Sequence, residues 1–123
     1  MTKQEILQQI ENQKAICVLR ISDDSLFEPV SKALYSGGIR LLEITMTVPN
    51  ATELIRKARK TLPRDMVIGV GSVLTAAATQ EAVNAGAEFV VSPVLKKEII
   101  DAAKTLEKPV MCGAFTPTEI QAA

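Results

Sequence analysis

The chain has 123 residues, the length of a single domain, and its 14 basic residues balance its 14 acidic ones. Basic residues do not cluster and aromatic residues make up only 3% of the sequence, so we expect no nucleic-acid partner, because such proteins carry basic patches and aromatic stacking platforms. No apolar stretch is long enough to cross a membrane, and the start of the chain lacks the apolar core of a signal peptide.

Hydrophobic periodicity predicts helices and strands that alternate along the whole chain. Glycine or proline and helix-capping residues separate most of the predicted elements. In chain order we expect helix 2–13, strand 15–20, helix 26–35, strand 41–46, helix 51–61, strand 66–73, helix 75–85, strand 88–93, helix 96–106, strand 109–114 and a helix that begins at 116.

The predicted strands recur at intervals of roughly 20–26 residues with a helix between each pair, which is typical of βα units in a parallel sheet. The repeated order of apolar strand and polar exit residue favours a (β/α)8 TIM barrel over a solenoid. A full barrel has about 250 residues. We therefore expect residues 1–123 to be a single domain, the N-terminal portion of such a barrel, and the chain to continue beyond Ala123 in a longer protein.

The stretch Gly37–Thr47 is the most informative part of the sequence. Gly37 and Gly38 end a helix, and Leu41–Met46 is apolar enough to be a strand buried on both faces. Glu43 lies inside this apolar strand. A carboxyl group there must be paired, protonated, or turned toward a pocket at the end of the strand. We favour the pocket, which makes Glu43 the best candidate for a general acid or base.

Polar residues follow the predicted strands where each one ends, and in a parallel barrel these positions form the active site. Together they offer one cation, one carboxyl group and several hydroxyl groups, which suits binding a small anion and moving a proton. The chain has no histidine, which excludes a serine activated by histidine, and we expect no metal and no cofactor. The candidate residues are Arg20, Glu43, Thr45, Thr47, Ser72, Ser92 and Pro93.

Several of these residues also have a structural interpretation. Arg20 suits a solvated strand end or an ion pair, and threonine is a good strand former in any case. The run Gly69–Ser72 matches only half of a dinucleotide-binding fingerprint, so we interpret it as a tight exit from a strand. Lys96 is a remote candidate for an imine-forming amine. Cys17 and Cys112 are expected to be reduced core residues of a cytoplasmic protein.

The motifs taken together resemble a known family, the 2-keto-3-deoxy-6-phosphogluconate / 4-hydroxy-2-oxoglutarate aldolases. The resemblance implies a class I aldolase on a (β/α)8 barrel, usually a homotrimer without metal. Such enzymes split a keto-acid substrate, a 2-keto-3-deoxy sugar acid, into pyruvate and an aldehyde. The segments that carry the resemblance are Val18–Arg20, Gly37–Thr45, Ile68–Val73, Ala85–Pro93, Gly113 and Thr116–Glu119.

The resemblance also implies roles for individual residues. Glu43 corresponds to the general acid or base, Arg20 and Thr47 to substrate contacts, and Ser72 to a hydroxyl group that holds the pyruvate carboxylate, while Ser92–Pro93 lines the pocket. The imine-forming lysine of the family lies on a sixth strand, beyond Ala123. We therefore expect this chain alone to be inactive.

Two other functions remain open from the sequence. The first is a half-barrel that acts as a structural or assembly module and pairs its open edge with a second chain. The second is a phosphate-binding βα domain without catalysis.

Overall fold

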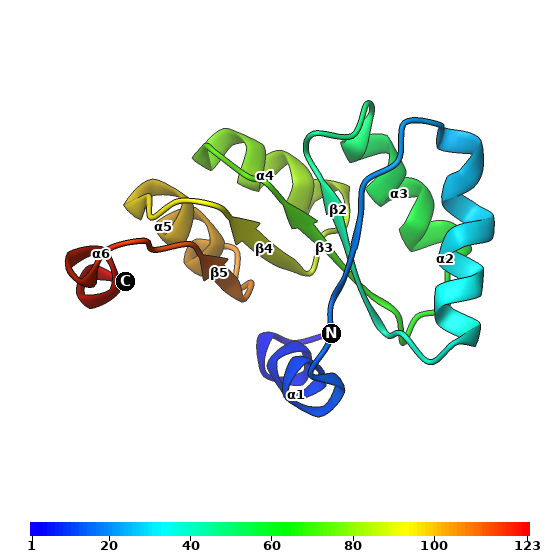
Figure 1. The fold of residues 1–123 in the computed structure, drawn as a ribbon, viewed down its shortest axis with the longest axis horizontal. Coiled ribbons are helices and arrows are strands. Elements are labelled where there is room, and N and C mark those ends of the chain that lie inside the picture. The colour runs from blue at the N-terminus through cyan, green and yellow to red at the C-terminus, as the bar shows by residue number, and fades with distance from the viewer.

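The computed structural model describes all residues 1–123 and contains one sheet of five parallel strands in the order β1-β2-β3-β4-β5. A helix connects each pair of successive strands (Figure 1). The strands are β1 (Cys17–Leu19), β2 (Leu41–Thr45), β3 (Val67–Gly71), β4 (Phe89–Ser92) and β5 (Val110–Cys112). The helices are α1 (Lys3–Gln13), α2 (Phe27–Ser36), α3 (Ala51–Thr61), α4 (Ala76–Ala85), α5 (Lys97–Thr105) and α6 (Pro117–Ala122), with a short 3-10 helix at Asp24–Leu26.

This order confirms the predicted α/β class, because consecutive strands are neighbours in the sheet as they are in a (β/α)8 barrel. The predicted strands run one to three residues longer at their ends than the observed ones, so Arg20 follows β1 rather than closing it. Side chains alternate between the two faces of the sheet. The strand register therefore decides which predicted site residues meet.

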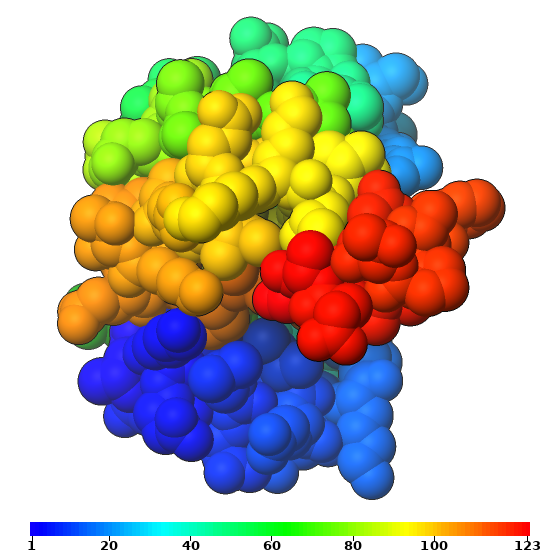
Figure 2. All heavy atoms as spheres, turned by 90° about the vertical axis from the view of Figure 1, so that its left-hand side faces the viewer, coloured from blue at the N-terminus to red at the C-terminus, as the bar shows by residue number.

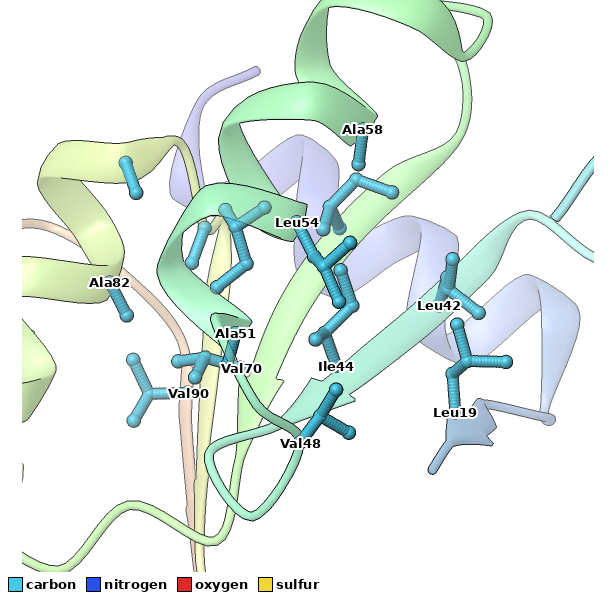
Figure 3. Close-up of a cluster of buried hydrophobic side chains, with 14 of the residues drawn as sticks. Leu19, Leu42, Ile44, Val48, Ala51, Leu54, Ala58, Val70, Ala82 and Val90 are labelled. Atoms are coloured by element: carbon cyan, nitrogen blue, oxygen red, sulfur yellow. The ribbon is translucent and has the colours of Figure 1, made fainter. Parts of the chain in front are cut away.

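The main core lies between the sheet and helices α2–α5 (Figure 3). Leu42 and Ile44 of β2, Val70 of β3 and Val90 of β4 point toward these helices. Leu54 of α3 packs onto them from the helix side. This face of the sheet is the helix-covered face, and its burial supplies most of the apolar stabilisation of the fold.

The opposite face of the sheet, here called the inner face, carries a smaller cluster. Ile6 of α1 packs there with Leu41, Val67 and Phe89, which come from three successive strands. Thr2 and Glu5 form a capping box at the start of α1. Helix α1 thus covers the amino-terminal half of the inner face, and Figure 1 shows it on the side of the sheet away from α2–α5.

Charged side chains at the amino ends of the strands are mostly paired. Arg59 of α3 donates to the carboxylate of Glu88 at 2.5 Å and to the carbonyl of Met66 at 2.8 Å. Tyr35 donates to Asp65 at 2.9 Å, and Arg40 stacks on the Tyr35 ring while it pairs with Asp65 at 3.3 Å. These contacts fasten helices α2 and α3 to the strands beside them.

Two expectations about burial are wrong. Cys17 and Cys112 are free thiols, as predicted, but both are only half-buried, because β1 and β5 are the edges of the sheet. The sequence also predicts that Leu26, Val30, Ala33 and Leu34 face the core. Val30 and Leu34 do pack against it, whereas Ala33 is exposed and Leu26, which ends the short 3-10 helix before α2, is half exposed.

The end of the chain packs loosely against the rest. Phe115 is 99% exposed and Ile120 of α6 is also exposed. A cleft of about 260 Å³ lies between α1, α5 and the last residue, where red atoms approach blue and orange ones in Figure 2. None of the helices has the length and apolar character needed to span a membrane.

Candidate active site

Glu43 lies on the inner face of β2. Leu42 and Ile44 point to the helix-covered core, so the alternation of side chains turns Leu41, Glu43 and Thr45 to the opposite side. Leu41 is covered by Ile6 of α1, whereas Glu43 lies one step closer to the carboxyl ends of the strands. The structure therefore places Glu43 where the apolar cluster under α1 ends and the carboxyl edge of the inner face begins.

Glu43 as a residue is only 8% exposed, and no protein group forms a hydrogen bond or an ion pair with its carboxyl group. Burial raises the pKa of Glu43 above its ordinary value, and the positive charge of Arg20 opposes this rise. A raised pKa keeps the acid form populated at higher pH than usual, which is how enzymes prepare a carboxyl group for proton transfer. Such groups concentrate at functional sites.

Arg20 is exposed and lies immediately after β1. It affects the charge of Glu43 through space but forms no ion pair with it or with any other carboxylate in the structure. Val18, which is paired with Glu43 in the register and shares its face, is 47% exposed. The approach to Glu43 from the β1 side is therefore open.

Thr45 and Thr47 lie beyond Glu43 along the chain. Thr45 is fully buried and its hydroxyl group is 2.8 Å from that of Thr47, which is exposed. The pair thus links a buried group to the surface at the carboxyl end of β2. The hydrogen bond between the two threonines uses one of their two hydroxyl hydrogens. The other hydroxyl hydrogen remains free to bind a ligand.

Ser72 follows β3 and adopts a left-handed backbone with φ 57°. This conformation is uncommon for residues other than glycine and is often stabilised at functional positions. The amide of Met46 donates to Gly71 at 2.8 Å and the amide of Val73 donates to Val91 at 3.2 Å. The turn that carries Ser72 is therefore held between the ends of β2 and β4.

The structure does not bring the side chain of Ser92 to this group. Ser92 shares the helix-covered face with Val90, two residues earlier, and its hydroxyl group donates to the carbonyl of Val94 at 2.9 Å. The expectation that it shares a rim with Arg20 and Glu43 holds for the edge of the sheet but not for the side-chain direction. Pro93 is exposed, and its backbone lies close to Gly113.

Lys96, the remote amine candidate, is also occupied. Its ammonium group donates to the carbonyl of Leu74 at 2.8 Å and so joins the loops that follow β3 and β4. This contact explains a lysine at the start of α5 without a catalytic role. A sequence pattern does not reveal it, because the two residues are far apart in the chain.

Sequence reasoning also missed the close approach of Glu43 to Gly71. The run Gly69–Ser72 was interpreted as the exit from the predicted strand 66–73, whereas β3 continues through both glycines to Gly71. Their alternate spacing in a strand was the available signal, since glycine in a strand often marks a close approach of other atoms.

The parallel βα order, with polar groups gathered at the carboxyl ends of successive strands, is the arrangement found in proteins of the (β/α)8-barrel class. The family model described as KDPG and KHG aldolase matches residues 6–123, and the chain belongs to this family. KDPG here is 2-keto-3-deoxy-6-phosphogluconate.

Curated relatives agree with the family match. The "KHG/KDPG aldolase" of Escherichia coli strain K12 is 36% identical over 92 residues, which are 75% of this chain and 43% of that protein. The "2-dehydro-3-deoxy-phosphogluconate aldolase" of Treponema pallidum is 33% identical over 118 residues, 96% of this chain and 56% of that protein. The chain thus spans about half the length of the curated relatives it matches.

Solved structures resemble the chain over the same extent. The KDPG aldolase of Legionella pneumophila, with pyruvate captured as a covalent carbinolamine intermediate, superposes with a TM-score of 0.81 at 32% identity. This match covers 87% of the present chain and 52% of the Legionella chain. The 2-keto-3-deoxy-6-phosphogluconate aldolase of Zymomonas mobilis, with 3-phosphoglycerate, has a TM-score of 0.79 at 31% identity.

Proposed function

We propose that the whole protein is a class I aldolase that cleaves 2-keto-3-deoxy-6-phosphogluconate or 4-hydroxy-2-oxoglutarate to pyruvate and an aldehyde. In this proposal the chain supplies the acid/base group and part of the substrate site. The observation that carries it is the buried carboxyl group of Glu43, which has no protein partner in a chain of the KDPG and KHG aldolase family. A carboxyl group left in this state costs stability, and a role in proton transfer accounts for its presence.

Glu43 moves protons in this mechanism. As the substrate imine breaks its C3–C4 bond, the carboxylate accepts the proton of the C4 hydroxyl group and an aldehyde leaves. The acid form of Glu43 then returns a proton to C3 of the enamine, and hydrolysis releases pyruvate. A carboxyl group with a raised pKa serves both steps, because its acid and base forms are closer in free energy at neutral pH.

The neighbouring polar groups bind the substrate in this proposal. Arg20 attracts the carboxylate of the keto-acid, and the hydroxyl groups of Thr45, Thr47 and Ser72 orient it beside Glu43. The left-handed backbone of Ser72 supports this role, since sparsely populated backbone conformations cluster at functional sites. Pro93 forms one wall, and the contribution of Ser92 is limited to its backbone because its hydroxyl group is bonded to Val94.

The imine-forming lysine belongs to the part of the family fold that this chain does not cover. The carbinolamine of the Legionella relative supports such a step in the family. Lys96 lies near the end of β4, but its ammonium group is bonded to Leu74. We therefore propose that Lys96 stays unmodified when the chain is treated with pyruvate and borohydride.

A chimera tests the proposal directly. Residues 1–123 replace the matching half of the Legionella aldolase, whose superposition covers 52% of that chain. Release of pyruvate from 2-keto-3-deoxy-6-phosphogluconate is followed with lactate dehydrogenase, and borohydride with pyruvate is expected to label a lysine of the Legionella half. A folded chimera that releases no pyruvate would reject the proposal, as would a label on Lys96.

We further propose that the whole protein is a homotrimer in the cytoplasm, as the resemblance to the family implies. The two free cysteines are compatible with a reducing compartment. Sedimentation of the full-length protein tests the trimer.

A second candidate function is an assembly module. The strands at both edges of the sheet are short and unpaired on one side, and Val18 is half exposed on the inner face. A single discrete oligomer of the 123-residue chain in native mass spectrometry would favour this function over that of a catalytic part.

A further inference from the structure

Two glycines of β3, Gly69 and Gly71, lie on the inner face, two residues apart. The register pairs Gly69 with Glu43 and Gly71 with Thr45, so both face the same side as the carboxyl group of Glu43. Each leaves a space beside the backbone that another side chain fills. Phe89 fills the space at Gly69, and Glu43 fills the space at Gly71.

The space at Gly71 is filled by Glu43. The three heavy atoms nearest to a Cβ placed there are all from Glu43: Oε1, then Cδ at 2.5 Å and Cγ at 2.9 Å. Real Cβ atoms do not approach other heavy atoms so closely. The carboxyl group therefore occupies the volume that any side chain at position 71 would need.

The two glycines together set the direction in which Glu43 lies. Glu43 stands opposite Gly69, but the ring of Phe89 already fills the space beside Gly69. The remaining space is diagonal, over Gly71, one step nearer to the carboxyl ends of the strands. This step carries the carboxyl group away from the apolar cluster under α1 and toward Ser72.

We propose that Gly71 is a positioning residue, which by lacking a side chain holds the carboxyl group of Glu43 at the carboxyl edge of the inner face. The functional meaning of this position rests on the proposed role of Glu43 as the acid/base group. The position itself is a property of the folded chain and does not require a substrate.

Backbone strain does not explain this glycine. Only Gly38 and Gly86 among the glycines have positive φ, so Gly71 has a backbone that alanine adopts freely. Gly71→Ala thus adds one methyl group and changes little else. Gly69→Ala is the matched control, because it adds the same group on the same face of the same strand but meets Phe89 instead of Glu43.

The first test measures the pKa of Glu43 by carbon NMR of its carboxyl group in the 123-residue chain. Arg20 is the charged group that acts on Glu43. The residue clusters on the two faces of the sheet near Glu43 are apolar. We expect Gly71→Ala to lower the pKa toward its ordinary value, because the only open direction for the displaced carboxyl group is toward solvent and Arg20. Gly69→Ala should leave it raised. An unchanged pKa in folded Gly71→Ala, or an equal fall in both variants, would overturn the proposal.

A second test does not depend on the pKa and covers the case in which Gly71→Ala unfolds. We expect Gly71→Ala to lower the Tm by about 5 °C or more in the wild-type background, since overpacking a close contact destabilises a domain of this size. In the Glu43→Ala background the same substitution should have little effect, because the three closest atoms are gone. Equal losses in both backgrounds would show that Gly71 serves something other than Glu43.

These outcomes are distinct from failure of the proposed function. If the chimera releases no pyruvate while both tests succeed, the aldolase proposal fails and the positioning role of Gly71 stands. If the chimera is active and both tests fail, Glu43 retains its role and Gly71 loses its own.

Discussion

Two buried carboxyl groups on the same sheet show how its two ends differ. Glu43 and Glu88 are each 8% exposed, yet Glu88 lies at the amino end of β4 and Glu43 lies near the carboxyl end of β2. Glu88 accepts hydrogen bonds from Arg59 at 2.5 Å and from the amide of Ile68 at 3.3 Å. The terminal amine of Met1 lies 3.7 Å from its other oxygen.

Glu43 has none of these partners. Its carboxyl group lies over a glycine, and a single exposed cation, Arg20, acts on it from a distance. The comparison teaches that burial alone does not define a functional acid. Pairing makes Glu88 part of the scaffold, whereas the absence of pairing leaves Glu43 free to exchange a proton, at a cost in stability.

The largest expected effect separates the two groups by activity. In the chimera, Glu43→Gln should reduce kcat for pyruvate release by about 10²–10⁴, the usual contribution of a general acid or base. Glu88→Gln should leave the rate per folded molecule nearly unchanged, because Glu88 lies at the other end of the sheet. The lactate dehydrogenase assay, normalised to folded protein by circular dichroism, checks both. Equal losses for the two variants would break the comparison.

The next effect separates them by stability. Arg59→Met should lower the free energy of unfolding by about 2–4 kcal/mol at neutral pH, because it removes the closer of the two cations that pair with the buried carboxylate of Glu88. Arg56→Met on the same helix is the control. Arg56 pairs only with the exposed Glu53, so its loss should cost less than about 0.5 kcal/mol. Urea unfolding measures both, and equal costs would contradict the structural role of Glu88.

A smaller effect concerns the pH dependence of stability. The folded pKa of Glu43 is raised above the unfolded value, so its contribution to stability is fully present below the ordinary pKa of 4.5 and is lost as pH rises through the raised value. Glutamine does not titrate, so the stability of Glu43→Gln does not include this pH-dependent contribution. The stability of the wild type relative to Glu43→Gln should therefore fall as the pH rises above the ordinary pKa of 4.5, as measured by urea unfolding. A flat difference would show that the carboxyl group is solvated.

The smallest effect concerns the threonine pair near Glu43. Thr47→Val should cost about 1 kcal/mol, because it leaves the buried hydroxyl group of Thr45 without its partner. Thr45→Val should cost less, since it removes the buried hydroxyl group and leaves an exposed one that water satisfies. Thermal unfolding of both variants ranks them, and the reverse order would mean that Thr47 does not serve Thr45.

The alternation of elements was accessible from sequence because it depends on local patterns. Helix α3 has the predicted bounds, and β2 is buried at every position, as its apolar composition indicated. Glu43 was recognisable because a charged residue interrupts an apolar strand. The glycines before β2 ended the preceding helix as predicted.

The failures share one cause, which is dependence on residues far away in the chain. The side chain of Ser92 points to the helix-covered face because the register fixes that direction. Arg59 and Glu88 meet across 29 residues, and Lys96 reaches Leu74 across 22. The space beside Gly71 exists only once β2 and β3 are paired. No local pattern records such contacts.

Helix α1 has a consequence for the order of folding. It precedes every strand in the chain, yet the surface that buries Ile6 is assembled from Leu41, Val67 and Phe89 of later strands. This surface is complete only after β4 has been synthesised. Helix α1 therefore stays exposed to solvent until β2, β3 and β4 have formed. Ordering of α1 should thus be a late event, and amide exchange in α1 should report how far the rest of the sheet has assembled.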